Sequence, residues 1–452
     1  MSGDPYLFRE LVTAFEVHGL RYCLLAGYDG YPASIVSDID FMVAPLDAPR
    51  VATLLAGVAR RCRARLVQCV QHETTAAWFV IARETASAVS FIQPDLSTDY
   101  RRRGRLWLQA EDIVARRRWH AGGFWVSSAA DAFIYYLIKR LDKGALSNAQ
   151  AQELTRRYRE DAPAAQRQLQ RHFPAPDAAL IDQALVEHEY ARLVASLGPL
   201  RDALHRRAPA EPLLRRMRQW VAERVRVMAR LWRPTGLSIA FLGPDGCGKS
   251  SVIDRVHHEL RDVFRRVDYQ HLRPRPPARA AADAIHAPVL QPHLQPPRGT
   301  LGSLTKLVHF WATYLIGTLR WTLPRRVRST LVIFDRYYHD ILADPRRYRY
   351  GAPLVWARLL GRMVPQPELV FVLDAPPEVI QARKQEVSFS ESARQRDAYL
   401  TLARQLRAAH VIDVARPLDT VVAEVIAIVL ARLEARVAAQ LALPSPARLE
   451  GV

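Results

Sequence analysis

The residues from Gly243 to Ser250 have the types and spacing of a phosphate-binding loop. They read GPDGCGKS, match the pattern GxxxxGK[ST], and lie between the apolar run LSIAFLG and an amphipathic stretch that predicts a helix. In such a loop the backbone N–H groups turn inward around phosphate oxygens, and the start of the following helix adds partial positive charge. Lys249 is then placed to bridge the β and γ phosphates of a nucleotide, and Ser250 to bind Mg²⁺.

The scarcity of lysine makes this motif more informative. The chain holds 64 Lys and Arg residues, and only Lys139, Lys143, Lys249, Lys306 and Lys384 are lysines. With so few lysines, the complete motif is expected by chance in roughly one such chain in a thousand. The motif therefore predicts a nucleotide-binding site with these contact residues: Gly243, Asp245, Gly246, Gly248, Lys249, Ser250 and Ser251.

An acidic and a basic residue follow one another at the end of the apolar run TLVIFD. Asp335 ends this predicted strand, which suits it to hold Mg²⁺ or its water shell. Arg336 comes directly after it, where a phosphoryl group would lie. A GTPase would be expected to carry an NKxD motif that reads guanine, and the sequence has none.

Three segments, GPDGCGKS, FDRYYHD and LVFVLDAPPEVIQARK, together resemble the thymidylate kinase branch of the nucleoside-monophosphate kinases. The resemblance covers about residues 236–435 and implies a P-loop NTPase fold, ATP, Mg²⁺ and a small-molecule phosphate acceptor. It also implies that Asp245 approaches the acceptor sugar and that Arg336 binds the acceptor phosphate. Cations of a lid would neutralise charge on the transferred group, and the corresponding stretch contains Arg383, Lys384, Arg394 and Arg396.

Two departures from this resemblance bear on the substrate. After Asp-Arg-Tyr, thymidylate kinases continue with Ser/Thr-rich residues that line the acceptor pocket, whereas this chain continues with YHDILADPRRYRYG. The Pro-rich stretch 273–298 is foreign to a compact thymidylate kinase. His271 and Arg273 follow a predicted strand at the edge where ligands bind in such sheets, so they are candidates to contact a different acceptor. A structural role for His271 stays an alternative, and the acceptor stays open.

Paired carboxylates mark a second candidate site near the N-terminus. Asp38 and Asp40 lie two apart on a predicted strand and point to the same face, and Asp95 ends a later strand. Three such carboxylates suit a divalent metal. With Gly27 upstream, the arrangement resembles the nucleotidyltransferase superfamily of DNA polymerase β, although Tyr28 stands where that family has Gly or Ser. The alternative interpretation is an ordinary turn at a strand end.

Length and periodicity predict the organisation of the chain. An α/β protein of 452 residues with 49% hydrophobic residues is expected to form two or three domains. Strand–helix alternation at the C-terminus predicts a doubly wound parallel sheet, and short apolar runs near the N-terminus predict a small α/β domain followed by a helical region. The expected segments are 1–104 (nucleotidyltransferase-like), 105–210 (helical), 211–235 (basic linker helix), 236–435 (thymidylate kinase-like) and 436–452 (tail).

The net charge of +19 predicts polyanionic partners but does not identify them. The helix expected at 211–233 interleaves arginine with Leu, Met, Val and Trp, so it suits either an anionic membrane surface or packing as a linker. A homodimer is also considered, whereas no sequence pattern for nucleic-acid binding is present. The stretch 307–323 is short for a membrane span and contains His309 and Arg320, so we expect a buried or surface helix.

Four cysteines without metal-ligand spacing, and an N-terminus unlike a signal peptide, lead us to expect a reducing, cytoplasmic location. Three functions remain in competition. The first is a kinase that phosphorylates a small acceptor, and the second is a nucleotide-gated binding module. The third is nucleotidyl transfer by the N-terminal domain, with the kinase supplying its substrate.

Overall fold

The computed structural model describes residues 3–36, 38–85, 89–276, 296–383 and 388–442. The chain divides into two compact units. Unit 1 comprises Met1–Val227 together with Glu434–Val452, and unit 2 comprises Met228–Leu433. Most of the Pro-rich stretch 273–298, and with it the loop expected there, lies outside the described residues.

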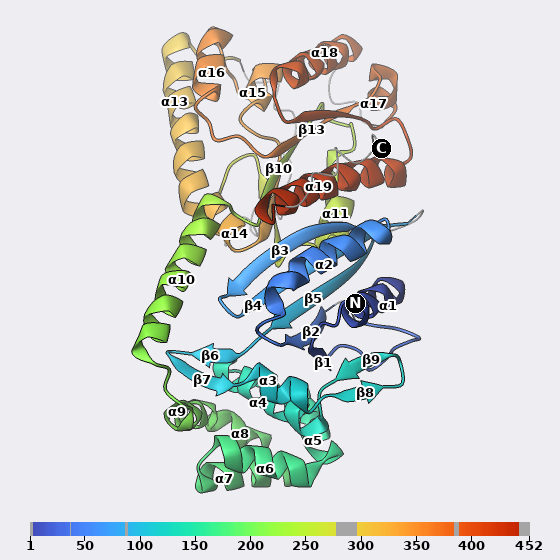
Figure 1. Cartoon of the computed structure of the whole chain (residues 1–452). Coiled ribbons are helices and arrows are strands. Elements are labelled where there is room, and N and C mark those ends of the chain that lie inside the picture. The colour runs from blue at the N-terminus through green and yellow to red at the C-terminus, as the bar shows by residue number, and fades with distance from the viewer. Residues whose placement is uncertain (1–2, 37, 86–88, 277–295, 384–387, 443–452) are drawn as a thin grey trace. The chain divides into compact units, whose positions relative to one another are not determined.

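Unit 1 is built on a seven-stranded mixed sheet with the order β3-β4-β5-β2-β1-β9-β8 (Figure 1). Its strands are β1 (Tyr22–Ala26), β2 (Asp38–Val43), β3 (Arg65–Glu73), β4 (Ala76–Glu84), β5 (Val89–Ser97), β8 (Arg118–His120) and β9 (Phe124–Val126). The first five coincide with the apolar runs noted in the sequence. The sheet extends past residue 104, where the sequence patterns place the end of the N-terminal α/β domain. The strands beyond that point, β8 and β9, are too short to show an alternating pattern. A separate hairpin joins β6 (Tyr100–Arg102) to β7 (Arg105–Leu108).

Both faces of this sheet are covered. Successive side chains of a strand point to opposite sides, so neighbouring residues belong to different core clusters. Leu24 and Phe41 pack with α1 (Pro5–Val17) and α2 (Ala48–Arg61) in one core cluster. Cys23, Leu25 and Met42 pack in a second cluster with the helical region. That region consists of α3 (Ala110–Ala115), α4 (Ala129–Lys143), α5 (Asn148–Glu160), α6 (Ala162–His172), α7 (Ala175–Val186), α8 (Tyr190–Ala195) and α9 (Leu197–Arg207). Sheet and helical region thus share a core within unit 1.

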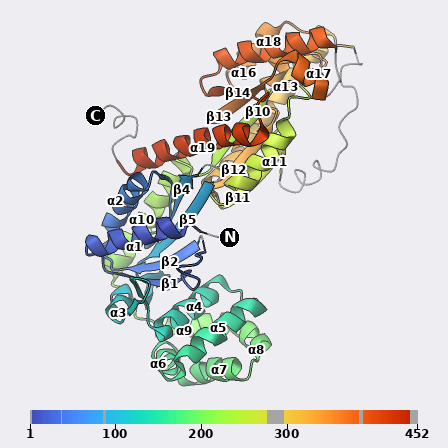
Figure 2. The same cartoon turned by 90° about the vertical axis from the view of Figure 1, so that its right-hand side faces the viewer.

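Unit 2 contains a five-stranded sheet in which all strands are parallel, with the order β11-β12-β10-β13-β14 (Figure 2). The strands are β10 (Leu237–Leu242), β11 (Arg266–His271), β12 (Thr330–Asp335), β13 (Leu369–Asp374) and β14 (Ala409–Asp413). Its helices are α11 (Lys249–Leu260), α13 (Thr300–Gly317), α14 (Leu323–Val327), α15 (Asp340–Ala343), α16 (Leu354–Gly361), α17 (Pro377–Arg383) and α18 (Phe389–Gln405). The parallel α/β architecture expected for this region is confirmed.

Two helices contain a boundary between the units. These are α10 (Leu213–Trp232) and α19 (Leu418–Gln440). The apolar stretch 307–323 forms the end of α13 and a π-helical turn, η1 (Thr318–Thr322), and its residues Leu307, Phe310 and Tyr314 are buried against the sheet. Among the described residues, no helix is long and apolar enough to cross a membrane.

A buried carboxylate, Asp4, begins α1 and ties it to the sheet. Its Oδ1 accepts hydrogen bonds from the backbone N–H groups of Tyr6 (3.0 Å) and Leu7 (3.1 Å). Its Oδ2 accepts from Arg83 Nε at 2.7 Å and from Ser90 Oγ at 2.6 Å. Burial alone would raise the pKa of Asp4, but the bonds from Ser90 and Arg83 outweigh it and lower the pKa. Asp4 therefore stabilises unit 1 in its ionised form.

Replacing Asp4 by Ala removes the helix cap and leaves Arg83 without this partner. We expect the free energy of opening α1 to fall by about 2–3 kcal/mol, measured at pH 7 by native-state hydrogen exchange of the α1 amides in the full chain. Asp4→Asn keeps the cap without the charge and is expected to lose about half as much. Because the folded pKa is lowered, wild type and Asp4→Asn should converge as the pH falls below about 4. Unchanged exchange in Asp4→Ala would contradict this role.

Candidate functional site

The loop between β10 and α11 depends on glycine. Gly243 has φ +147°, and a Cβ atom at this position would lie 2.7 Å from the Leu373 carbonyl oxygen of β13. Gly246 and Gly248 have φ values of +84° and +91°, in the left-handed region that glycine tolerates without strain. These dihedrals bend the chain back over the end of the central strand β10, so that the loop leads directly into the N-terminus of α11.

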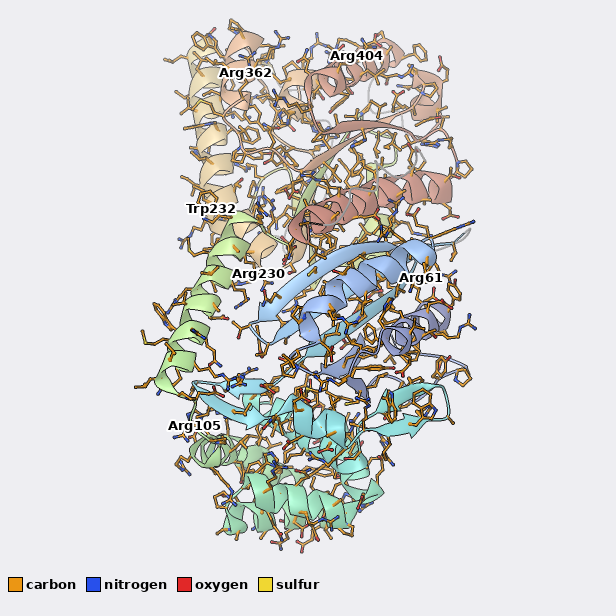
Figure 3. The ribbon with its side chains drawn as sticks, in the orientation of Figure 1. Arg61, Arg105, Arg230, Trp232, Arg362 and Arg404 are labelled. Carbon is orange, nitrogen blue, oxygen red and sulfur yellow. The ribbon has the colours of Figure 1, made fainter. Side chains whose placement is uncertain are left out.

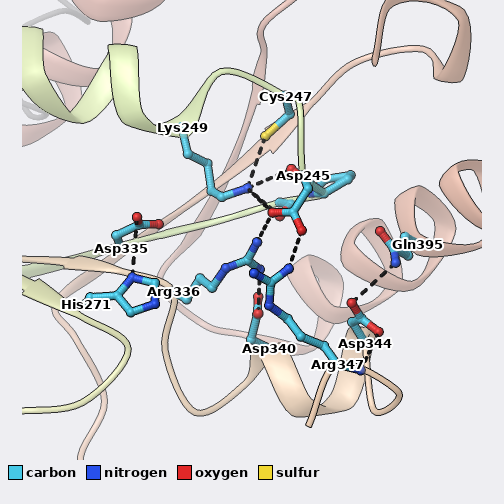
Figure 4. Close-up of polar contacts among 12 residues, drawn as sticks. Asp245, Cys247, Lys249, His271, Asp335, Arg336, Asp340, Asp344, Arg347 and Gln395 are labelled. Carbon is cyan, nitrogen blue, oxygen red and sulfur yellow. Dashed lines mark hydrogen bonds and ion pairs between the residues drawn. The ribbon is translucent and has the colours of Figure 1, made fainter. Parts of the chain in front are cut away.

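The Lys249 side chain is buried against this loop (Figure 4). Its Nζ donates to the carbonyl oxygens of Gly243 at 2.9 Å and Pro244 at 2.7 Å, and lies 3.7 Å from Cys247 Sγ. Ser250 and Ser251 occupy the first turn of α11 and are exposed. The loop, the lysine and the two serines thus lie together at the carboxyl end of β10.

Asp335 ends β12, the strand beside β10, and is nearly buried. Its Oδ2 accepts a hydrogen bond from Tyr269 at 3.0 Å and lies 3.7 Å from His271 Nδ1, whereas its buried Oδ1 has no hydrogen-bond partner among the described residues. Burial would raise the pKa of Asp335, but His271, Lys249 and Arg336 together lower it. An ionised carboxylate with one unused buried oxygen fits a divalent cation.

Arg336 is the centre of a buried ion network (Figure 4). Its backbone has φ +70°, and its N–H donates to the Phe241 carbonyl oxygen of β10 at 2.9 Å. The guanidinium forms ion pairs with Asp245 of the loop and, at 2.6 Å, with Asp340 Oδ2. The fully buried Asp340 also accepts hydrogen bonds from Tyr399 at 2.6 Å and Tyr348 at 2.9 Å. The Asp-Arg-Tyr turn is thereby fastened to the glycine-rich loop between β10 and α11.

The carboxylate of Asp245 is surrounded by cations. It pairs with Arg336 and Arg347, and its Oδ1 lies 3.8 Å from Lys249 Nζ. Burial would raise the pKa of Asp245, but the charges of Arg336, Lys249 and Arg347 hold the pKa well below its usual value. Asp245 is therefore ionised at neutral pH, with two arginines converging on the same loop.

The predicted lid residues differ in their surroundings. Arg383 ends α17 and lies near the loop, since a Cβ atom on Gly248 would be 3.8 Å from its Nη1, and its Nη2 donates to the Val414 carbonyl oxygen at 2.9 Å. Arg394 instead makes a two-point ion pair with Glu391 on its own helix (2.6 and 2.9 Å). Arg396 is likewise held by Asp374, at 2.7 and 2.9 Å. Lys384 lies outside the described residues.

Four residues of the network were not singled out from the sequence: Asp340, Arg347, Tyr348 and Tyr399. Three of them belong to the segment YHDILADPRRYRYG, in which a carboxylate four residues after Arg336 was an available signal. Tyr399 lies 63 residues beyond Arg336 on α18, and only the fold brings the two together, with Arg336 Nη1 3.4 Å from the tyrosine hydroxyl.

The N-terminal carboxylates come together in part. Parallel pairing of β2 with β5 places Asp40 directly beside Asp95, and Asp38 lies two residues earlier on β2. Gly27 lies close to this strand, because a Cβ atom on it would be 2.6 Å from the Asp38 carbonyl oxygen. Among the described residues, no three His, Cys, Asp or Glu side chains form a group that could hold a metal ion. Metal binding by these aspartates therefore stays a prediction.

A lysine occupies the space beside these carboxylates. Lys139 Nζ on α4 lies 2.8 and 3.0 Å from the two carboxylate oxygens of Asp40. Burial would lower the pKa of Lys139, but Asp40, Asp95 and Asp38 outweigh it and raise the pKa. Lys139 is therefore paired and partly buried, whereas Lys143, one turn later, is exposed.

Comparison with known proteins relates the chain to thymidylate kinases. No protein-family model matches. The chain is 26% identical over 152 residues to a thymidylate kinase of Malacoplasma penetrans, covering 33% of this chain and 67% of the relative. It is 28% identical over 197 residues to a probable thymidylate kinase of Caldivirga maquilingensis, covering 41% of this chain and 90% of the relative. A solved thymidylate kinase from Ehrlichia chaffeensis aligns with 43% of this chain and 99% of its own at 20% identity. The TM-score of this alignment is 0.31, too low to show a shared fold.

Asp340 tests how far the ion network determines the site. Asp340→Asn preserves the volume but leaves the buried Arg336 short of one negative partner, so we expect unit 2 to lose about 2–4 kcal/mol of stability. The measurement is hydrogen exchange of the β10 and β12 amides in the full chain. Asp419→Asn is a matched control, because this carboxylate pairs with Arg255 at the surface and is 83% exposed. Equal exchange in the two variants would show that the network is dispensable.

Proposed function

We propose that this protein is an ATP-dependent phosphotransferase of the nucleoside-monophosphate kinase type. It moves the γ-phosphoryl group of ATP to a nucleotide or another small phosphorylated or hydroxylated acceptor. The observation that carries the proposal is the convergence of Lys249, Asp335, Arg336 and Asp245 at the carboxyl end of the parallel sheet. This is the edge at which open α/β sheets bind their ligands. The sequence similarity to thymidylate kinases supports it.

On the donor side, the phosphates of ATP lie along the loop from Gly243 to Ser250. The backbone N–H groups of the loop and the N-terminus of α11 donate to phosphate oxygens. Lys249 exchanges its contacts with the loop carbonyl oxygens for the β and γ phosphates. Arg383, which lies near Gly248, adds positive charge where negative charge develops during transfer.

On the acceptor side, Arg336 and Asp245 contact different groups of the acceptor. Arg336 binds an acceptor phosphate, and its buried ion pair with Asp340 fixes the direction of the guanidinium. Asp245, held ionised by the surrounding cations, accepts a hydrogen bond from an acceptor hydroxyl. Arg347 also reaches Asp245, from the segment that departs most from thymidylate kinases. The assay therefore includes acceptors other than thymidylate.

Mg²⁺ fits the donor site through Asp335 and Ser250. The unused buried Oδ1 of Asp335 is a ligand of the kind this cation prefers, and the Ser250 hydroxyl lies at the start of α11. When bound, Mg²⁺ would neutralise negative charge on the phosphates of ATP. Lys249 and Arg336 add to that neutralisation from the protein, and Tyr269 orients the Asp335 carboxylate.

The test is transfer of labelled γ-phosphate from ATP to a panel of nucleoside monophosphates, sugars and sugar phosphates. We expect at least one acceptor to be labelled and Lys249→Ala to lower kcat by about 100-fold or more, because it removes a charge that stabilises the transition state. Arg336→Ala should lose acceptor binding. Arg255→Ala is the control, since it lies on α11 but pairs with Asp419 at the surface. Tight ATP binding without any labelled acceptor would instead favour the nucleotide-gated module.

A second candidate function is nucleotidyl transfer by unit 1. The observation in its favour is the adjacency of Asp40 and Asp95 on parallel strands, with Asp38 on the same face of β2. The contact between Lys139 and Asp40 weighs against metal binding in this arrangement. The two candidate functions use different residues, so they can be separated by mutation.

If unit 1 transfers nucleotidyl groups, incorporation of α-labelled ATP into an acceptor should require Mg²⁺ or Mn²⁺. We expect this incorporation to be lost in Asp38→Asn and Asp40→Asn and retained in Lys249→Ala, because Lys249 belongs to unit 2. Leu46→Glu is a control substitution on the surface of the same unit and should retain incorporation, since this side chain is 80% exposed. Loss in Lys249→Ala with retention in Asp38→Asn would reject the second candidate.

A further inference from the structure

Helix α10 exposes its apolar side chains. None of its residues is buried, although the helix spans 20 residues. Its large apolar side chains are between 40% and 81% exposed: Leu213, Leu214, Met217, Trp220, Val221, Val225, Val227, Met228, Leu231 and Trp232. At 100° per residue these positions fall on one side of the helix, within an arc of roughly 160°. The arc also contains Arg224, whose guanidinium lies over the Trp220 ring at 5.2 Å.

The opposite, polar side of α10 faces the protein. The less exposed positions are Gln219, Glu223, Arg226 and Arg230, which recur every three or four residues and form one stripe. In unit 1, Arg226 donates to the Gln71 carbonyl oxygen at 3.0 Å and to Glu223. In unit 2, Arg230 donates to Ser329 Oγ at 3.1 Å; Figure 3 labels Arg230 and Trp232 near the end of the helix.

This orientation is the reverse of that in an ordinary surface helix, which buries its apolar stripe and exposes its charges. The polar contacts of α10 are satisfied within the units, so a rotation that buried the apolar arc would break them. Ten exposed apolar side chains on one face form a patch of the kind that marks an interaction site. The occupant of this face must therefore be apolar where it meets the arc.

Charge selects the occupant. Between Leu213 and Trp232 the helix carries six arginines against one acidic residue, Glu223. Arg226 and Arg230 contact the protein, which leaves the exposed arginines outside the polar stripe for a partner: Arg215, Arg216, Arg218 and Arg224. A second copy of the helix would bring like charges together, which opposes self-association. An anionic bilayer offers acyl chains to the apolar arc and phosphate headgroups to the arginines. Trp220 and Trp232 are side chains that favour the boundary between these two zones.

A groove in unit 1 continues this surface. It has a volume of about 880 Å³, with Met217, Trp220 and Val221 on one wall and the hairpin residues Arg101 to Gly104 on the other. Arg216 lies against Gly104, where a Cβ atom would be 2.6 Å from its Nε. The groove therefore places apolar and cationic groups side by side, as a lipid headgroup with its attached chains requires.

We propose that α10 is a membrane-docking helix that lies along the surface of an anionic lipid bilayer. Its apolar arc enters the boundary between headgroups and acyl chains, and its flanking arginines bind the headgroup phosphates. The helix remains parallel to the surface and does not span the bilayer. This function is independent of phosphoryl transfer, and it assigns a partner to part of the +19 net charge.

The test is co-sedimentation of the full chain with vesicles of phosphatidylcholine alone and of phosphatidylcholine with 30% phosphatidylglycerol. We expect at least about tenfold stronger binding to the anionic vesicles, weakening as salt is raised. The double variant Leu214→Glu with Val221→Glu should lose about tenfold or more of that binding. Val17→Glu with Leu46→Glu is the matched control, since it adds the same charge at exposed apolar positions of unit 1 and should bind as wild type does.

Circular dichroism and thermal unfolding establish that each variant is folded. Equal binding to both kinds of vesicle, or equal loss in the two double variants, would overturn the proposal. Sedimentation equilibrium without lipid addresses the competing occupant. A dimer abolished by Leu214→Glu with Val221→Glu, in a protein that does not bind anionic vesicles, would assign the face to a second copy and would also overturn it.

Discussion

The burial of Arg336 is the constraint on which the site in unit 2 depends. A desolvated guanidinium is costly unless carboxylates and hydroxyls surround it, and here Asp245, Asp340 and Tyr399 do so. These partners come from the loop after β10, from the adjoining helix α15 and from α18, so the cost of leaving the charge unpaired stabilises the packing of these three segments. The same network holds the pKa of Asp245 well below its usual value, so one set of contacts both organises the loop and keeps its carboxylate ionised.

Unit 1 also neutralises partly buried charge, but here the charge is negative and the partner is a cation. Parallel pairing brings Asp40 beside Asp95, and the resulting repulsion needs a cation. The ammonium group of Lys139 meets this need from a helix 99 residues away in sequence. Both units therefore pair a charged side chain of the sheet region with a side chain of a packed helix, Arg336 with Asp340 of α15 and Asp40 with Lys139 of α4. In unit 2 an oxygen of Asp335 remains for a further ligand, whereas in unit 1 both oxygens of Asp40 contact lysine.

Much of the fold was predictable because its signals are local. The parallel sheet of unit 2 follows from apolar runs alternating with helices, and short apolar runs near the N-terminus predict the α/β architecture of unit 1. The strands β8 and β9 were missed because three residues are too few for periodicity to appear. The site was predictable where residues adjoin in sequence, as in Gly243–Ser250 and Asp335–Arg336. Tyr399 was missed because only long-range packing brings it to Arg336, whereas Asp340 lies four residues after Arg336, a spacing that the sequence does show.

The sequence by itself determined the glycine-rich loop Gly243–Ser250, since the φ values of its glycines and the position of Lys249 follow from a contiguous motif. It also determined that α10 is amphipathic, because that property depends only on residue spacing. Tertiary structure decided which face of α10 is turned to solvent, since the polar stripe finds hydrogen-bond partners at Gln71 and Ser329. It likewise decided that Lys139 is paired with Asp40. Such outcomes depend on the free energy of satisfying buried charges across distant segments, which no local pattern encodes.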